Sequence, residues 1–357
     1  MASTAVSKYQ NHRRFALSWC IGIIGGTLLF FEQVPLAWLL GSMVASSIAA
    51  LSGLEITTWI RLTPWARCVL GVMVGTGITP IPMAELISYG VTLAMVPLFL
   101  LGSISLNYWM LRRMFRQNAA TALFSALPGG MVEMITTGRE YGADPKFLTT
   151  VHLIRVIAIV AGAAFLGAMV GLADFRMQTP AWDHWQYVPL HLLLGVVGWR
   201  VGVRLRIPSA SLLAPMFMVT ALQASDVLHM QLFTPLIIVA QVIIGIDIAR
   251  SFNGVSLRAM RIPFIAAGMS VLVMTAVLAV LALAILTLRT DLPLIQVVLS
   301  FLPGGQTELA LLAFALKLDL TFVVTHQIFR IALIMFSLPL FIVWLTRWRR
   351  PDDSSSR

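Results

Sequence analysis

Long, uninterrupted apolar runs constrain this chain more than any other feature of its sequence. Ile262 to Leu288, Phe147 to Leu172 and Leu320 to Leu345 are each long enough to cross the apolar core of a bilayer as one helix. Hydrophobic residues make up 59% of the 357 residues and charged residues only 11%, whereas about a quarter of the residues in soluble domains are charged. A soluble protein can bury one such helix, but not several. The sequence therefore predicts an all-α, polytopic membrane protein.

The charge distribution and the cysteines exclude several classes of protein. The formal net charge is +10, but Lys and Arg cluster just beyond the apolar runs, as the positive-inside bias predicts. No soluble basic domain is present to hold nucleic acid, so DNA or RNA is excluded as a partner. Cys20 and Cys68 lie inside apolar segments and provide neither a disulfide framework nor a metal-binding spacing. The run near Phe15 to Phe31 lacks a small-residue cleavage site, so we interpret it as a first span and not as a removed signal peptide.

The chain contains an internal repeat. Leu127 to Met134 (LPGGMVEM) recurs as Leu302 to Leu309 (LPGGQTEL), at an offset of 303 − 128 = 175. The same offset pairs four further positions: Asp144 with Asp319, Phe147 with Phe322, Thr150 with Thr325, and Arg155 with Arg330. Earlier segments pair more weakly at offsets of 173 and 170, which indicates small loop insertions: Gly22–Gly25 with Gly195–Gly198, Pro35–Leu40 with Pro208–Leu213, and Val72–Gly75 with Val242–Gly245. We therefore predict two diverged copies of one unit, with these boundaries: a cytoplasmic N-terminus (1–14), membrane repeat 1 (15–172), a linker (173–186), membrane repeat 2 (187–346) and a cytoplasmic tail (347–357).

The number of membrane crossings depends on whether each Pro-Gly-Gly segment crosses the bilayer or returns to the side it entered. If both segments return and the N-terminus is inside, every arginine cluster that follows a span faces the cytoplasm, including Arg112 to Arg116, Arg200 to Arg206 and Arg250 to Arg261. With six crossings in each half, the cluster from Arg200 to Arg206 would face outward. The sequence therefore favours about ten transmembrane helices plus two re-entrant or broken helices, arranged as an inverted repeat with both termini inside. A broken helix that crosses fully is the alternative.

The two motifs, Pro128-Gly129-Gly130 and Pro303-Gly304-Gly305, each interrupt an apolar segment. Proline removes a hydrogen-bond donor and clashes with the preceding turn, and glycine permits backbone angles that other residues avoid. The freed backbone groups must be buried in protein or line a cavity, and inverted repeats with discontinuous helices are the usual architecture of secondary transporters. A simple kink is the alternative. Two copies, each with a glutamate three residues after the second glycine, favour a functional site.

Charged side chains at membrane depth are the next candidates. Glu133 and Glu308 begin the half-helices after the breaks, where a carboxylate can cap free amides and also face a cavity. A charge there costs roughly 2.5–3.5 kcal/mol on insertion scales and usually has a partner. Arg155 and Arg330 lie within the long final spans, at equal distances from the two glutamates. Two interpretations stay open for the arginines: an Arg–carboxylate pair, such as Arg330 with Glu308 or Asp319, or a fork for an anionic substrate.

Three further polar residues are candidates for ion or solute binding. His326 and Arg330 are four residues apart and share one helix face, with Gln327 between them. His326 can carry a proton at physiological pH, or it can make a hydrogen bond between helices. Asp247 is a candidate for a coupling cation or proton, and a helix-end cap near Arg250 is the favoured alternative. No nucleophile elbow, phosphate loop or zinc-helix signature is present, so we expect no enzyme activity, no metal and no cofactor.

At the paired motifs the chain resembles the bacterial membrane-bound AbrB family. The residues that carry this resemblance lie in both halves, so it covers nearly the whole chain: Leu127-Pro128-Gly129-Gly130, Tyr141-Gly142-Ala143-Asp144 and Arg155 in the first, and Leu302-Pro303-Gly304-Gly305, Glu308, Asp319, His326-Gln327 and Arg330 in the second. The first copy has Val151-His152 where the second has His326-Gln327, so the half-sites are not equivalent.

The resemblance implies a duplicated protein of the bacterial cytoplasmic membrane, with a fold similar to cation:proton antiporters and anion transporters. The family is described as a regulator of gene expression and has also been labelled an ammonia monooxygenase. No copper or iron ligand cluster is visible in the sequence to support the second label. The shared name of a small soluble DNA-binding regulator does not apply, since this chain does not resemble that protein.

We therefore expect a secondary transporter or exporter of a small polar or anionic solute, and a membrane-bound regulator of gene expression, acting indirectly or through a partner, is the alternative. The expected partners are the lipid bilayer, the solute and, by analogy, H⁺ or Na⁺; a homo-oligomer is left open. The expected solute site combines the two breaks with nearby polar residues: Pro128, Gly129, Gly130, Glu133, Asp144, Arg155, Pro303, Gly304, Gly305, Glu308, Asp319, His326, Gln327 and Arg330.

Overall fold

The structure, a computed structural model, confirms the all-α prediction. It describes the residues 2–59, 61–79, 83–169, 182–207, 209–226, 230–255, 257–289 and 292–347, and every regular element within these ranges is a helix. The predicted linker (173–186) and the predicted tail (347–357) lie largely outside the described residues.

Several helices have the length and composition of membrane spans. Within the described ranges, five helices are long and apolar enough to cross a bilayer: α1 (Ala2–Phe31), α5 (Gly90–Arg113), α8 (Pro145–Met169), α12 (Leu257–Leu288) and α15 (Leu320–Arg347). Five shorter helices have 15 to 17 residues: α2 (Ala37–Leu51), α3 (Leu62–Gly77), α9 (Val188–Arg204), α10 (Ala210–Ala224) and α11 (Thr234–Arg250). Helices of spanning length and composition therefore occur in both halves of the chain.

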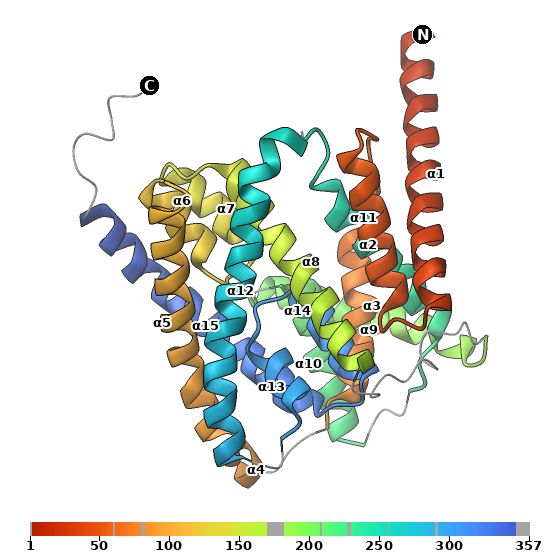
Figure 1. Cartoon of the computed structure of the whole chain (residues 1–357). Helices are drawn as coiled ribbons and strands as arrows, with labels where there is room; N and C mark the ends of the chain where they lie inside the picture. The colour runs from red at the N-terminus through yellow and green to blue at the C-terminus, as the bar shows by residue number, and fades with distance from the viewer. Residues whose placement is uncertain are drawn as a thin grey trace. The chain divides into compact units, whose positions relative to one another are not determined.

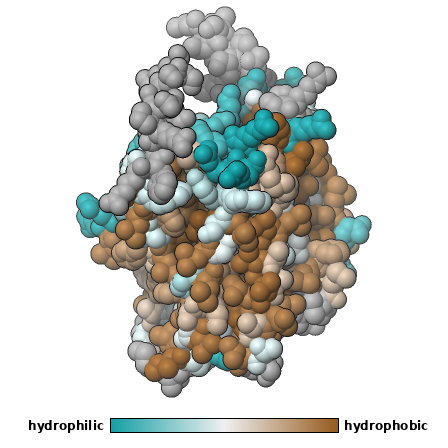
Figure 2. Space-filling model, turned by 60° about the vertical axis from the view of Figure 1, so that its left-hand side comes forward, coloured by the Kyte–Doolittle hydropathy of each residue, from teal (hydrophilic) through white to brown (hydrophobic). Residues whose placement is uncertain are grey.

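The surface of the protein is unusually apolar. Large hydrophobic side chains such as Phe336, Val280 and Leu340 are 82%, 73% and 72% exposed, respectively. Hydrophobic residues cover most of the face drawn in Figure 2. Monomeric soluble proteins rarely expose contiguous apolar patches of this kind, so a lipid environment accounts for the surface.

The chain packs as two compact units, each of which draws segments from both halves of the repeat. Unit 1 combines Met1–Pro82, Val160–Ala259 and Gly304–Thr321. Unit 2 combines Met83–Ile159, Met260–Pro303 and Phe322–Arg357. Unit 1 therefore holds α1, α2 and α3 of the first half together with α9, α10 and α11 of the second (Figure 1).

Within unit 1 the two halves pack on each other reciprocally. Gly75 of α3 lies against α10, where an added Cβ would be 2.6 Å from the carbonyl oxygen of Met216. Gly245 of α11 lies against α2, where an added Cβ would be 2.8 Å from the amide nitrogen of Met43. The repeat offsets relate these pairs, because Gly245 is equivalent to Gly75 (245 − 75 = 170) and Met216 to Met43 (216 − 43 = 173). The contact of α3 with α10 is therefore repeated, at equivalent positions, between α11 and α2.

The contacts of α3 also give the relative directions of the helices around it. Gly71 and Gly75 face Leu212 and Met216 in that order, so α3 and α10 run in the same direction. By contrast, Gly195 of α9 lies against Cys68, and the Trp199 ring lies 6.0 Å from that of Trp65. Since the α9 numbers rise as the α3 numbers fall, α3 and α9 run in opposite directions.

The repeat is also visible in the backbone conformation. Three residues of unit 1 with a left-handed φ recur at an offset of 173: Gln33 (54°) with Arg206 (55°), Leu36 (55°) with Ser209 (49°), and Gly53 (93°) with Asp226 (59°). Gly142 (79°) and Lys317 (53°) are related by the offset of 175. Left-handed backbone is uncommon for residues other than glycine, so its recurrence at equivalent positions reflects a shared local fold.

Unit 2 holds α5, α12 and most of α8 and α15, together with the first Pro-Gly-Gly segment. It also contains the short helices α4 (Met83–Ser88), α6 (Ala119–Ala126), α7 (Met131–Glu140) and α13 (Leu294–Phe301). Gly102 of α5 faces Val277 of α12, and the two helices run side by side (Figure 1). α14 (Gln306–Ala315), which follows the second Pro-Gly-Gly motif, belongs to unit 1.

Candidate functional site

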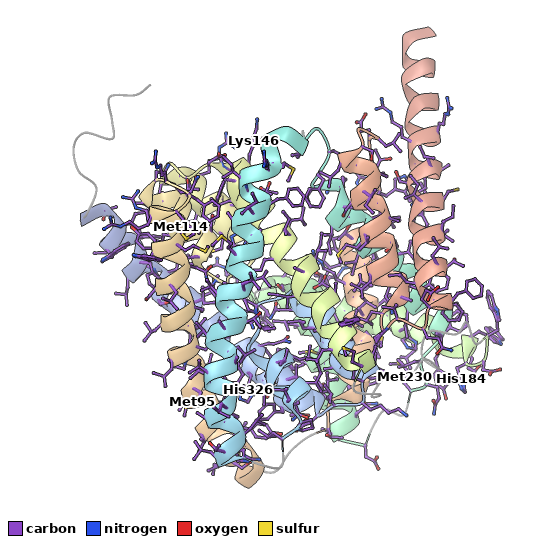
Figure 3. The ribbon with its side chains drawn as sticks, viewed as in Figure 1. Met95, Met114, Lys146, His184, Met230 and His326 are labelled. Atoms are coloured by element: carbon purple, nitrogen blue, oxygen red, sulfur yellow. The ribbon has the colours of Figure 1, made fainter. Side chains whose placement is uncertain are left out.

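The first Pro-Gly-Gly motif forms the tip of a hairpin in unit 2. The Asn118 side chain caps α6 by accepting from the amide of Thr121 at 2.7 Å, and the motif separates α6 from α7. The chain then returns to where it began, because the amide of Asp144 donates to the Thr121 hydroxyl at 2.9 Å and the Asn118 amide group donates to the carbonyl of Gly142 at 3.1 Å. In Figure 3, Met114 before the hairpin and Lys146 after it lie toward the same end of unit 2. The first motif therefore lies at the tip of a helical hairpin whose two ends meet.

The second motif breaks the chain with nearly the same backbone geometry. The residues that end the first half-helices have φ, ψ of −66°, 124° at Leu127 and −65°, 135° at Leu302. The glycines that begin the second half-helices have −61°, 130° at Gly130 and −66°, 136° at Gly305. All four residues therefore have extended backbone. Each motif inserts a non-helical stretch between an eight-residue helix and a ten-residue helix.

Glu133 and Glu308 lie where a helix-capping side chain is expected. Each is the third residue of its helix, and its carboxylate folds back onto the N-cap glycine, Gly130 or Gly305, where it would collide with any added Cβ. A glutamate at this position can accept from the free N-cap amide and also favours the positive end of the helix. Glu308 is buried whereas Glu133 is exposed. This geometry favours the capping interpretation, and it explains why each motif ends in a glycine.

Arg155 of α8 reaches the tip of the first hairpin. Its guanidinium donates to the carbonyl of Ser125 at 3.2 Å and to that of Leu127 at 3.5 Å. It also lies 2.6 Å from Nδ1 of His152, whose Nε2 is 3.0 Å from the carbonyl of Phe124. The arginine can only donate and the carbonyl can only accept, so these partners fix His152 as the neutral tautomer with hydrogen on Nε2.

Arg330 of α15 likewise binds carbonyls at the second break, and Leu302 is the counterpart of Leu127. It donates to the carbonyls of Phe301 and Leu302 at 3.0 and 2.8 Å, and Gln327 donates to the carbonyl of Leu299 at 3.1 Å. The offset of 175 relates Gln327 to His152 and Leu299 to Phe124, so the same bond is made in both halves. Carbonyls at a helix C-terminus have no partner within the helix. The final span of each half therefore supplies side chains that satisfy the broken helix before it.

The two arginines are the most distinctive chemical feature of unit 2. Both are 2% exposed. Within the part of the chain that the structure describes, neither is in an ion pair, and Nε of each lacks a hydrogen-bond partner. Glu308 and Asp319, the carboxylates proposed as partners of Arg330, belong to unit 1. Unit 2 thus buries two cations that are bonded to backbone carbonyls and not to carboxylates.

The remaining predicted residues fall into two groups. Asp144 caps α8, because its carboxylate accepts from the amides of Lys146 and Phe147 at 2.9 and 3.3 Å, and Asp319 occupies the equivalent position just before α15. Asp247 forms an ion pair with Arg250 at 3.0 Å on α11. His326, by contrast, is fully buried in unit 2 and bonds to another helix. Among the described residues, no three His, Cys, Asp or Glu side chains gather in a way that could hold a metal ion.

Sequence reasoning missed two parts of this arrangement. The carbonyls that bind the arginines could not be identified, since a main-chain acceptor carries no residue-type signal. Thr92, which lies 2.9 Å from Nε2 of His326, was also missed because one threonine in an apolar helix is unremarkable. The shared role of His152 and Gln327 could have been predicted, because the repeat offset of 175 relates the two positions.

Comparisons with known proteins match most of the chain. The family described as "Transition state regulatory protein AbrB" matches residues 38–346. The chain is 28% identical over 315 residues to "Putative regulator AbrB" of Escherichia coli (strain K12), covering 86% of this chain and 89% of that protein. It is 23% identical over 372 residues to YhjN of Bacillus subtilis (strain 168), covering 90% of this chain and 91% of that protein. No solved structure matches the chain.

Proposed function

The chain belongs to the AbrB family, and from this premise and the geometry of unit 2 we propose that it is a secondary transporter or exporter of a small anionic or polar solute. The observation that carries the proposal is the buried pair Arg155 and Arg330. A charged side chain at membrane depth is costly and usually marks a substrate or ion pathway. Each helix C-terminus supplies only about half a negative charge, so the two arginines retain a positive excess that an anion would neutralise.

The donors of the arginines support an anionic ligand. A guanidinium presents five N–H donors in a planar fork that matches a carboxylate or phosphate. Arg330 uses one terminal nitrogen for both carbonyl bonds, and its Nε is buried without a partner. Arg155 has the same unpartnered Nε. An anion that accepted from these donors would satisfy buried polar groups that otherwise lower stability.

We further propose ten crossings of the bacterial cytoplasmic membrane, with both termini inside. The first hairpin, whose two ends meet, supports five crossings in the first half, so the second half would begin from the opposite side. The parallel course of α3 and α10 also supports this arrangement. α10 is the counterpart of α2, and α2 and α3 would cross in opposite directions as successive spans. α10 can therefore run parallel to α3 only if the second copy is inverted.

A thermal-shift screen of the purified protein against small carboxylates, phosphates and other polar metabolites tests the solute site. A ligand at 100 times its dissociation constant adds about 2.7 kcal/mol of apparent stability. We expect this shift to be lost in Arg330→Lys, which keeps the charge but not the fork, and to persist in Arg113→Lys, where the arginine is exposed. Uptake of the same compound into vesicles then tests transport. A stabilising ligand that binds Arg330→Lys equally well would refute the site, and binding without uptake would refute transport.

The name of the Escherichia coli relative favours a second candidate function, a membrane regulator of gene expression. Such a protein would sense or move a signal metabolite and act on transcription indirectly or through a partner. Arg330→Lys separates the two functions. If the variant loses both uptake and transcript control, regulation would be a consequence of transport. If it loses transcript control but keeps uptake, the result would favour the regulator.

A further inference from the structure

A groove opens on the surface of unit 2 between α5, α6 and α15, and its volume is about 410 Å³. Side chains of three helices line it: Ile104, Ser105 and Tyr108 of α5, Leu123 of α6, and Leu340 and Trp344 of α15. Leu340 is 72% exposed, whereas Leu123 is 2% exposed. The groove therefore opens on the apolar surface that faces lipid, and a buried side chain closes its base.

The lining of the groove suits a hydrocarbon chain. Aliphatic and aromatic side chains dominate it, and Ser105 adds one hydroxyl group. Lipid tails are as apolar as these side chains, so a tail that moves from the bilayer into the groove gains packing contacts but little from the hydrophobic effect. The apolar lining alone therefore does not favour one phospholipid over another. Any preference has to come from groups at the end of the groove where a headgroup would lie.

An aromatic pair marks the end of the groove that suits the headgroup level. The rings of Tyr108 and Trp344 are 5.3 Å apart and meet edge to face, at 76°. Tyrosine and tryptophan are enriched at membrane–water interfaces, because each has an apolar ring and a polar tip. α5 ends shortly beyond Tyr108, at Arg113. Figure 3 shows Met114, just beyond this helix end, at the end of unit 2 where Lys146 also lies.

Arg112 continues the same face of α5 toward the headgroups. Ser105, Tyr108 and Arg112 are three and four residues apart, so their side chains lie one above another on the helix. Arg112 is exposed, and its guanidinium donates to the carbonyl of Gln117 at 2.8 Å. A guanidinium has five N–H donors in a fork that matches a phosphate, so this one bond leaves donors for a headgroup. Arg112 can therefore bind a phosphate one helical turn beyond the aromatic pair.

The charges of the three helices favour an anion at this end of the groove. The residues 87–132 and 320–347, which include α5, α6 and α15, contain no Asp or Glu. Arg113 and Arg116 follow Arg112 along the chain. Where the hairpin returns, two acidic residues are each close in sequence to a basic one: Glu140 to Arg139, and Asp144 to Lys146. The cations of the link between α5 and α6 are therefore in excess.

We propose that this groove binds an anionic phospholipid, with one acyl chain along Leu123 and Leu340 and the headgroup phosphate on Arg112. Basic pockets between membrane helices select anionic headgroups on the cytoplasmic side, where the proposed topology places this end of α5. The lipid would contact α5, α6 and α15 together. It would thus stabilise the first hairpin and the helix that carries Arg330. The site itself does not depend on the proposed transport.

Native mass spectrometry of the full-length protein in detergent tests the site with two lipids that differ only in their headgroups. Dioleoylphosphatidylglycerol is anionic, whereas dioleoylphosphatidylcholine has no net charge because its choline group offsets the phosphate. We expect the dissociation constant of the anionic lipid to be about tenfold lower, which is the smallest factor typical of hydrogen bonds to a charged group. Equal dissociation constants for the two lipids would overturn the proposal.

Two pairs of variants locate the bound lipid. Arg112→Gln should lose the preference for the anionic lipid, whereas Arg204→Gln, which removes an exposed arginine at the end of α9, should keep it. Ser105→Phe should fill the groove and weaken the binding of both lipids. Leu272→Phe, at an exposed position of α12, should weaken neither. All four positions are exposed, so melting temperatures without lipid should match that of the unmodified protein. Equal effects within either pair would refute the site, whether or not a solute is transported.

Discussion

His152 and Gln327 are different residues at equivalent positions of the repeat, and both bind a backbone carbonyl of the broken helix before them. Each reaches a carbonyl near the C-terminal end of a broken helix, at 3.0 Å for His152 and 3.1 Å for Gln327. His152 also accepts from Arg155 through Nδ1. A glutamine offers an amide donor and a carbonyl acceptor, so it can supply both bonds from one side chain.

This equivalence predicts that His152→Gln is tolerated and His152→Leu is not. Leucine would leave the carbonyl of Phe124 and a donor of Arg155 buried without partners, and an unsatisfied buried group costs about 1–3 kcal/mol. Glutamine should change the apparent stability by less than about 1 kcal/mol, because it restores both bonds. Thermal unfolding of the two variants in detergent measures the difference. Equal losses in both would show that the imidazole ring itself is required at this position.

Arg155 and Arg330 are buried, as their place inside apolar runs predicted, but their partners were not predictable. Residue types suggested carboxylates or an anion, and the structure adds backbone carbonyls exposed by the helix breaks. A capping role for Glu133 and Glu308 was among the predictions, since glutamate in the first turn is a common cap. Contacts that use the main chain depend on geometry, and residue identity does not reveal them.

At the scale of elements, glycines set the distance between the two halves of unit 1. Gly71 and Gly75 let α3 approach the backbone of α10, and Gly245 does the same between α11 and α2. The repeat offsets predicted that α11 is the counterpart of α3 and that α10 is the counterpart of α2. The left-handed backbone at Gln33 and Leu36 was not predictable, because these residue types rarely adopt it and only packing can impose it.

We expect Gly75→Ala and Gly245→Ala to destabilise the protein by similar amounts. Each added methyl group would meet backbone atoms of the partner helix, and overpacking of this kind costs about 1–3 kcal/mol. Gly162→Ala and Gly268→Ala are matched controls inside helices, where nothing lies within 4 Å of the added carbon. These should be neutral or stabilising by up to about 1 kcal/mol. Apparent melting temperatures of the four purified variants give the comparison. If Gly75→Ala matches its controls, the close packing of α3 on α10 is wrong.

At the scale of the whole molecule, the order of the repeat along the chain differs from the way the chain packs. The sequence indicates two consecutive halves, whereas unit 1 and unit 2 each combine segments of both. Duplication of one unit explains the two consecutive halves. The second arises because helices of one copy bury their small-residue faces on helices of the other, as α3 does on α10. Sequence offsets identify equivalent helices, but they do not specify which helices pack together.

The inverted topology makes opposite predictions from a parallel repeat for the loops of the second half. Leu205→Cys, after α9, should be cytoplasmic, and Ser225→Cys, after α10, should be external; both positions are exposed. Each substitution would be made after replacing Cys20 and Cys68, the two cysteines of the chain. A membrane-impermeant thiol reagent applied to intact cells should then label Ser225→Cys, while Leu205→Cys should react only after the membrane is opened. With the N-terminus inside, the reverse pattern would require six crossings in each half. It would also leave the common direction of α3 and α10 without an explanation, because α10, as the counterpart of α2, should then run opposite to α3.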